Sequence, residues 1–166
     1  RHGRQTAGMI TGIEVVLLDE KPDVLLLYGD TNSTLAGAIA ASKQHFPVIH
    51  IEAGLRSFNK AMPEELNRII SDHASTLLFA PTNSAFKNLI HEGFRPENSP
   101  PYTIDNPKIY LTGDIMYDNS LFFAELAERK KGELLESLSL ERGKFVLATI
   151  HRDINTDDPK RLEAIL

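Results

Sequence analysis

The stretch Val24-Leu25-Leu26-Leu27-Tyr28, followed by Gly29-Asp30-Thr31-Asn32-Ser33, decides the fold that this sequence predicts. Such an unbroken apolar run is typical of a strand that is buried on both faces of a parallel sheet. The small and polar residues after the run form a turn, and the alanine-rich segment 34–44 has the composition of a helix. A strand, a short turn and a helix in this order form the repeating unit of α/β proteins.

The same unit recurs along the chain. Further apolar segments predict strands at 48–52, 76–80, 108–112 and 144–150. Helical patterns lie between them, at about 63–73, 82–92 and 117–138, and a first helix ends near residue 20. Alternating strands and helices with short loops predict a doubly wound parallel α/β sheet.

The charged segment after the fourth predicted strand suggests how the chain is divided. We expect residues 1–116 to form part of an amino-terminal domain, 117–142 a connecting helical region, and 143–166 the start of a second domain. The chain also begins without an initiator methionine. We therefore expect it to be part of a longer protein.

Composition narrows the function classes. A hydrophobic content of 42% and a charged content of 25% are those of a globular protein, and no apolar run approaches the length of about 20 residues that a membrane span needs. The net charge of -5 argues against nucleic-acid binding, because nothing would neutralise a row of phosphates. The chain has no cysteine, no histidine pair with the spacing of a metal site and no glycine fingerprint for a dinucleotide or nucleoside triphosphate.

Polar residues follow the ends of the predicted strands. Ligands of open parallel sheets bind beyond the carboxyl ends of the strands. Glu64 opens the helix after the second strand and should return to the same rim. The other rim residues are Asp30, Glu52 with Arg56, Pro81 with Thr82, Gly113 with Asp114, and His151 with Arg152.

Each of these residues also has a purely structural interpretation. Asp30 could cap the following helix, and Glu64 could favour the helix dipole and pair with Arg68 one turn later. His151 could be an ordinary loop histidine. Glu52 is harder to explain in this way, because a carboxylate at the mouth of a buried strand is costly unless a polar group meets it. The residues alone favour a small-molecule enzyme with a carboxylate-rich rim.

Several motifs resemble, in register, the non-hydrolysing UDP-N-acetylglucosamine 2-epimerases. The resemblance runs through essentially the whole chain, so the motifs together are far more specific than any one of them. They are the segments 28–36, 50–57 and 62–68, Asp72-His73, the segments 79–82 and 112–114, Tyr117-Asp118, and Thr149-Ile150-His151-Arg152.

The resemblance implies a GT-B-like fold of two Rossmann-like domains with the active site between them. On that template the chain lacks the first strands of one domain and nearly all of the UDP-binding domain. Family members convert UDP-N-acetylglucosamine to UDP-N-acetylmannosamine by eliminating UDP and adding it back, without a redox cofactor. The resemblance makes Asp30, Glu52 and Glu64 the acid/base carboxylates and places His151 near the diphosphate.

The resemblance also implies accessory roles. Arg56, Arg68 and Arg152 would bind substrate or orient the carboxylates, and His2 would match a histidine of a second, activating substrate site. A cytoplasmic homodimer that serves cell-surface polysaccharide biosynthesis is implied for the full-length protein. The isolated chain should be inactive. The alternatives are a 2-epimerase of a related UDP-2-acetamido sugar, a non-catalytic nucleotide-sugar-binding module and, less well supported by three rim carboxylates, a GT-B glycosyltransferase.

Overall fold

The structure is a computed structural model, and it describes residues 2–129, 133–151 and 153–166. The chain divides into two compact units, one that runs to Asn119 and one that spans Ser120–Leu166. The division falls inside helix α5 (Ile115–Arg129). The domains expected from the sequence, 1–116, 117–142 and 143–166, stay a prediction.

Four parallel strands form the sheet of the first unit, and their order in the sheet is their order along the chain. Each strand begins and ends within one residue of its predicted position, so the predicted parallel sheet is confirmed. The strands are β1 (Leu25–Tyr28), β2 (Val48–Ile51), β3 (Leu77–Ala80) and β4 (Lys108–Leu111).

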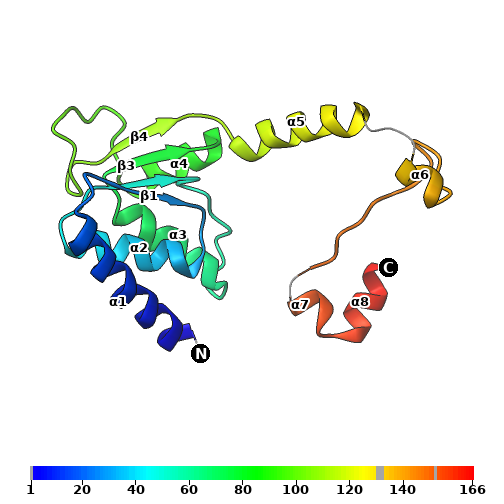
Figure 1. Cartoon of the computed structure of the whole chain (residues 1–166), viewed down its shortest axis with the longest axis horizontal. Helices are drawn as coiled ribbons and strands as arrows, with labels where there is room; N and C mark the ends of the chain where they lie inside the picture. The colour runs from blue at the N-terminus through cyan, green and yellow to red at the C-terminus, as the bar shows by residue number, and fades with distance from the viewer. Residues whose placement is uncertain (1, 130–132, 152) are drawn as a thin grey trace. The chain divides into compact units, whose positions relative to one another are not determined.

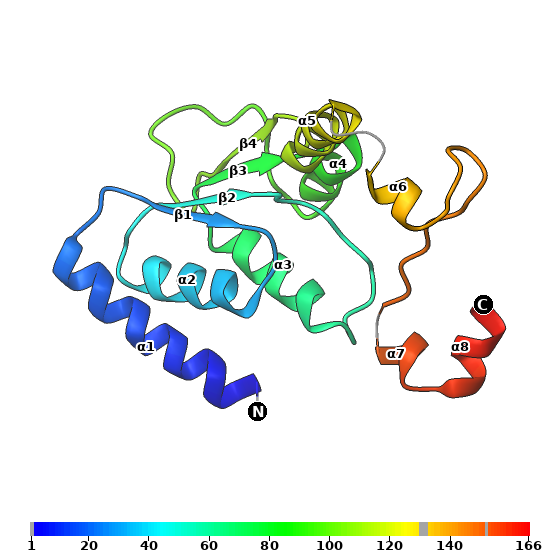
Figure 2. The ribbon, with the colours of Figure 1, turned by 45° about the vertical axis from the view of Figure 1, so that its right-hand side comes forward.

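Four helices accompany these strands: α1 (His2–Glu20), α2 (Asn32–Lys43), α3 (Pro63–His73) and α4 (Asn83–His91). The Thr31 and Thr82 hydroxyls cap α2 and α4 by accepting hydrogen bonds from backbone N–H groups of the first turn. Helices α1, α2 and α3 lie on the same side of the sheet in both views (Figures 1 and 2). Right-handed connections that always advance to the next strand place their helices on one face.

One face of the sheet is therefore the core. Leu27, His50, Leu78 and Ile109 lie side by side in neighbouring strands and are buried beneath the helices. Residues of α1 and α2 pack against β1 and β2, and residues of α4 pack against β3 and β4. This packing positions the loops that follow the strands.

The other face of β1 is open. Leu26 is 44% and Tyr28 is 60% exposed, so the prediction that β1 is buried on both faces is wrong for the described residues. The apolar run correctly indicated a strand, but burial on the second face needs a covering layer, and the described helices α1–α4 cover the first face.

The second unit holds the end of α5 together with α6 (Glu133–Ser137), α7 (Asp153–Thr156) and α8 (Pro159–Ile165). The predicted fifth strand at 144–150 is not formed, and Val146 and Leu147 are 91% and 89% exposed. A strand is stabilised by backbone hydrogen bonds to a neighbouring strand, and each strand within the described ranges belongs to the sheet of the first unit. None of the helices in the described part of the chain is long and apolar enough to cross a membrane.

Candidate functional site

Glu52 lies directly beyond β2 in an unusual backbone conformation. Its φ is 70°, in the left-handed region that residues other than glycine rarely adopt. The backbone thereby turns the carboxylate toward the turn after β1: a Cβ on Gly29 would lie 3.2 Å from the Glu52 Oε2. Among the described residues, the carboxylate of Glu52 has no hydrogen-bond or ion-pair partner. A strained, partly buried and unpartnered carboxylate at a strand end is a candidate catalytic group.

Asp30 lies next to Gly29 and is tied to helix α3. Its Oδ2 is 2.5 Å from Arg68 Nη2, and its backbone carbonyl accepts a hydrogen bond of 2.9 Å from Asn67 Nδ2. These contacts bring the first half of α3 to the carboxyl ends of β1 and β2. This ion pair holds the Asp30 carboxylate against Arg68.

Glu64 and Glu65 open α3 and behave differently. Glu64 is partly buried in the first turn, one turn before Arg68, and so lies at the end of the helix that contacts the Asp30 turn. Glu65 is 1% exposed and accepts hydrogen bonds from the backbone N–H groups of Ser57 and Phe58, at 2.9 and 2.8 Å. Arg68 reaches Glu65 as well, at 3.1 Å. The structure thus brings Asp30, Glu52 and the start of α3 to one rim.

Burial by itself would raise the pKa of Glu65, but the donors around its carboxylate outweigh burial. The backbone N–H groups of Ser57 and Phe58, with the Arg68 guanidinium, lower the pKa below its ordinary value. Glu65 therefore stays ionised and anchors the loop after β2. At the start of this helix the sequence pointed to Glu64 and not to Glu65. The available signal was its spacing from Asp72, which places both carboxylates on the same side of α3.

A buried chain of alternating charges lies beneath the rim. His50 Nδ1 is 2.7 Å from Asp72 Oδ1, and Arg56 Nη2 is 2.7 Å from Asp72 Oδ2. The other side of the Arg56 guanidinium pairs with Glu92, with Nε 2.7 Å from Oε1. His50 and Asp72 are 0% exposed, and the side chain of Arg56 is 1% exposed. Sequence spacing identified no partner for His50, because Asp72 reaches it only through the packing of α3 on β2.

Arg56 lies where it can orient carboxylates, which is one of the two roles that the resemblance implies for it. Its guanidinium is buried and contacts Asp72, Glu92 and the carbonyl of Leu55. This geometry argues against a direct contact with substrate and favours a role in orienting the buried Asp72 carboxylate and the partly exposed Glu92 carboxylate. Glu92 and Asp72 attract the Arg56 charge, and despite burial they raise the pKa of its guanidinium.

A cavity of about 250 Å³ opens beyond the carboxyl ends of β2, β3 and β4. Glu52 contributes its wall on one side, and Asp118 of α5 contributes a second carboxyl group. In the sequence, Asp118 stands out only as part of the Tyr117-Asp118 motif, and the aspartate expected at the rim is Asp114. The remaining lining residues are Ile51, Phe79, Pro81, Thr112, Gly113 and Ile115.

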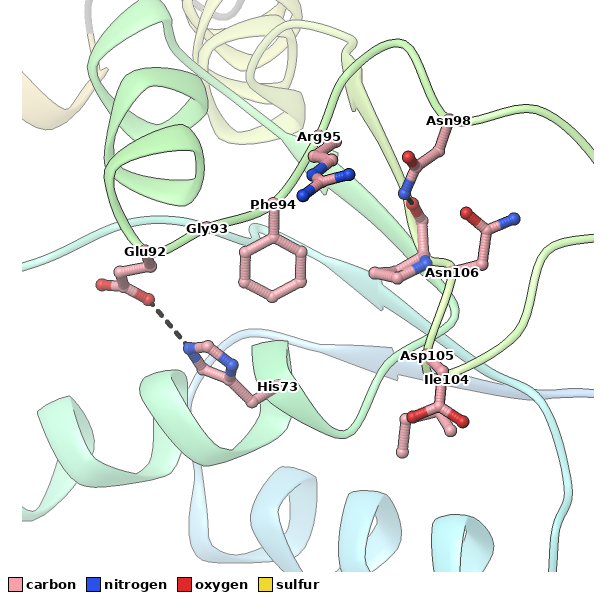
Figure 3. A pocket seen from close by; sticks show the side chains of 10 residues that line it. His73, Glu92, Gly93, Phe94, Arg95, Asn98, Ile104, Asp105 and Asn106 are labelled. Carbon is pink, nitrogen blue, oxygen red and sulfur yellow. Dashed lines mark hydrogen bonds and ion pairs between the residues drawn. The ribbon is translucent and has the colours of Figure 1, made fainter.

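A second cavity, of about 450 Å³, lies where α3 and α4 end and β4 begins (Figure 3). In Figure 3, His73 points toward Glu92, with Nε2 3.3 Å from Oε2, and its ring lies 4.9 Å from that of Phe94. Arg95, Asn98 and Asp105 are among its other lining residues. This cavity is at the amino end of β4, whereas substrates of parallel sheets bind at the carboxyl ends. We therefore place the candidate site at the first cavity.

The remaining expected site residues lie in the second unit or outside the residues that the structure describes. His151 belongs to the second unit, where it is exposed and its carbonyl accepts a hydrogen bond of 3.0 Å from Asn155 Nδ2. Arg152 and the side chain of His2 lie outside the described residues. Within the described ranges no group of three or more His, Cys, Asp or Glu residues could hold a metal ion.

Comparisons with known proteins identify the family of the chain. A family model described as UDP-N-acetylglucosamine 2-epimerase matches residues 1–166. A UDP-N-acetylglucosamine 2-epimerase homolog from Methanococcus maripaludis is 47% identical over 165 residues, and a UDP-2,3-diacetamido-2,3-dideoxy-D-glucuronate 2-epimerase from Pseudomonas aeruginosa is 52% identical over 165 residues. Each match covers 99% of this chain and 43% of the relative.

A solved structure gives the same result. The UDP-GlcNAc 2-epimerase of Methanocaldococcus jannaschii, in complex with UDP-GlcNAc and UDP, superposes with a TM-score of 0.76 and 43% sequence identity, over 99% of this chain and 42% of that chain. The GT-B-like fold that the resemblance implied is thus shared with the solved relatives. Because the family model matches the chain from end to end and the fold agrees, this chain belongs to the UDP-N-acetylglucosamine 2-epimerase family.

Proposed function

We propose that the full-length protein containing this chain interconverts UDP-N-acetylglucosamine and UDP-N-acetylmannosamine by inverting C2. The observation that carries the proposal is the rim itself. Glu52, strained and unpartnered within the described residues, lies against the turn that bears Asp30 and lines a cavity at the carboxyl ends of the strands. This is the chain's part of the site, since the chain spans about 43% of the length of its relatives.

The chemistry explains why several carboxylates are needed. The proton on C2 is not next to a carbonyl group, so its removal is coupled to cleavage of the bond between C1 and the UDP oxygen. One carboxylate takes the proton while UDP leaves, and an acid then returns a proton to the opposite face of C2 as UDP adds back to C1. General acid and base groups of this kind each contribute about 10²–10⁴-fold.

Each rim residue has a place in this proposal. Asp30, Glu52 and Glu64 are the acid/base candidates, and Arg68 holds Asp30 in position through their ion pair. His151 would stabilise the charge of the departing UDP when protonated. The reaction needs no redox cofactor. The homodimer and the cytoplasmic location implied by the resemblance belong to the same proposal, and light scattering on the full-length protein tests the dimer.

Amide variants of the carboxylates test the proposal directly. In the full-length protein, Asp30→Asn, Glu52→Gln and Glu64→Gln should each lower turnover by about 10²-fold or more, because an amide cannot exchange the proton. The assay follows incorporation of deuterium at C2 in heavy water together with release of UDP. Glu97→Gln, an exposed carboxylate in the loop after α4, is the matched control and should keep the wild-type rate. Wild-type rates in all three rim variants would contradict the assigned roles.

A second candidate substrate is favoured by one comparison. The relative from Pseudomonas aeruginosa, which is 52% identical, is named as a 2-epimerase of UDP-2,3-diacetamido-2,3-dideoxy-D-glucuronate. The same carboxylates would serve this substrate, because the reacting atoms C1 and C2 are the same. Comparing kcat/KM for the two UDP-sugars on the full-length protein decides between them. Tight binding of both without deuterium incorporation would favour a non-catalytic binding module.

A further inference from the structure

His50 lies between two acceptors, and this placement determines its protonation. Its Nε2 is 2.7 Å from the carbonyl oxygen of Gly29, and its Nδ1 is 2.7 Å from Asp72 Oδ1. A carbonyl oxygen can only accept a hydrogen bond, so Nε2 must carry a proton. If Asp72 is ionised, Nδ1 must carry a proton too, and His50 is an imidazolium.

Two donors besides His50 point at the Asp72 carboxylate. Its Oδ2 accepts a hydrogen bond of 3.0 Å from the backbone N–H of Gly54 and pairs with the Arg56 guanidinium at 2.7 Å. A backbone N–H and a guanidinium on the same oxygen are the partners of a carboxylate, so the remaining contact, at Oδ1, is one in which His50 Nδ1 donates. The charged groups facing His50 are Asp72 of α3 and, behind Asp72, Arg56 of the loop after β2. Burial by itself would lower the pKa of His50, but Asp72 and the Gly29 carbonyl outweigh burial and raise it.

The network joins the segments that carry the rim residues. Gly29 precedes Asp30, Gly54 follows Glu52 by two positions, and Asp72 lies on the helix that carries Glu64 and Arg68. The Glu52 carboxylate also lies against Gly29. A buried ion pair is weak support for stability, because desolvation offsets the attraction. The His50–Asp72 pair contacts the turn after β1 through Gly29 and the loop after β2 through Gly54, which indicates a role in positioning these two segments.

We propose that His50 is a positioning residue that stays protonated on both ring nitrogens and, through the Gly29 carbonyl, fixes the turn bearing Asp30 beside the Glu52 carboxylate. The reaction that it serves is the one proposed above. The protonation state does not depend on that reaction. The two parts of the proposal therefore have separate tests.

The first test is nitrogen NMR of His50 in the full-length protein. We expect both ring nitrogens to show the imidazolium signature unchanged between about pH 5 and pH 8, where an ordinary histidine loses its proton. The signal is assigned by its loss in His50→Gln. A neutral tautomer at neutral pH would overturn the protonation claim, whatever the protein is found to catalyse.

The second test is kinetic. The His50→Gln side chain retains an N–H donor for the Gly29 carbonyl but is neutral, and His50→Ala has no donor. Because a misplacement of about 1 Å can lower a rate by about 10²-fold, we expect kcat to fall by about that factor in His50→Ala, less in His50→Gln, with KM within about 3-fold in both. Wild-type kcat in folded His50→Ala would overturn the positioning role.

His73→Gln is the matched control. It makes the same substitution at the outer end of the network, where His73 contacts Glu92 and its side chain is 49% exposed (Figure 3). We expect its kcat to stay within about 2-fold of wild type, since a surface pair contributes little. An equal loss of kcat in His73→Gln and His50→Gln would show that the effect is not specific to His50.

Asp72→Asn supplies a readout that a structural role would not move. Without the Asp72 charge, His50 should titrate, and the pH profile of kcat should gain an inflection that the wild type lacks. An unchanged profile in a folded Asp72→Asn would contradict the proposal. Wild-type protein that turns over neither UDP-sugar would instead remove the proposed function, and the NMR test would still decide the protonation of His50.

Discussion

At the scale of single residues, the site depends on a few positions whose backbone has a positive φ or passes very close to a neighbouring segment. Glu52 adopts a φ of 70° and Gly29 a φ of 64°. A Cβ on Gly29 would lie 3.2 Å from the Glu52 Oε2, so a side chain at Gly29 would crowd the carboxylate. Gly54 is more restricted still: a Cβ there would lie 2.3 Å from the carbonyl oxygen of Ala85. The loop that carries Glu52 can therefore pass close to α4 only because it lacks a side chain at Gly54.

Gly54→Ala should therefore be strongly destabilising. The methyl group would collide with the α4 backbone, and the φ of 79° is unfavourable for alanine, so we expect a loss of about 2–4 kcal/mol in the free energy of unfolding. Gly93→Ala separates the two causes, because Gly93 has a φ of 100° but nothing within 4 Å of the added Cβ. Its loss should be about 1 kcal/mol in urea denaturation. Equal losses would contradict the steric explanation.

At the scale of elements, α3 connects the parts of the site. One side of the helix holds the Asp30 turn through Arg68 and Asn67, and its buried carboxylates Glu65 and Asp72 hold the loop after β2. Sequence reasoning found the helix and its bounds, because Pro63 and the carboxylates after it are local signals. The sequence pointed to Glu64 and not to Glu65, because adjacent helix positions point in different directions and only the path of the loop between β2 and α3 decides which one is buried.

The ionised carboxylates of this region predict how stability varies in acid. Donors lower the pKa of Glu65, and Arg56 lowers the pKa of Glu92, so both groups bind protons more weakly in the folded state than in the unfolded state. Their contribution is present above the ordinary value of 4.5 and is lost as pH falls through the folded values.

Chemical denaturation between about pH 7 and pH 3 measures this effect. We expect Glu65→Gln to be less stable than wild type at neutral pH and to lose less stability on acidification. Glu64→Gln is the neighbouring control, since it leaves the anchor of the loop intact. A Glu65→Gln protein with the acid dependence of wild type would show that other carboxylates dominate.

At the scale of the whole molecule, the limits of sequence reasoning follow from distance along the chain. Apolar runs and helix caps are local, so the four strands and the four helices of the first unit were predictable. The pairing of His50 with Asp72 bridges two elements and appears only when α3 packs on β2. The segment 144–150 has the composition of a strand but forms none among the described residues, because a strand also depends on its partner.

The chain by itself should not carry out the proposed reaction. It brings the carboxylates but spans about 43% of the length of its relatives, and catalysis of this kind depends on orienting the leaving group. We expect no measurable epimerisation by the 166-residue chain and clear turnover by the full-length protein, in the same deuterium assay. Substantial turnover by the short chain would contradict this expectation.

The order of the strands has a consequence for biosynthesis. Because β1 pairs with β2, β2 with β3 and β3 with β4, each strand from β2 to β4 meets a partner that the ribosome has already released. During synthesis, at about 5–20 residues per second, domains fold as units, beginning with the amino-terminal one. Only neighbours in the chain need to find each other, which keeps the loops to be closed short. The sheet can thus grow vectorially during translation, and the ionic network beneath the rim closes once α4 delivers Glu92 to Arg56.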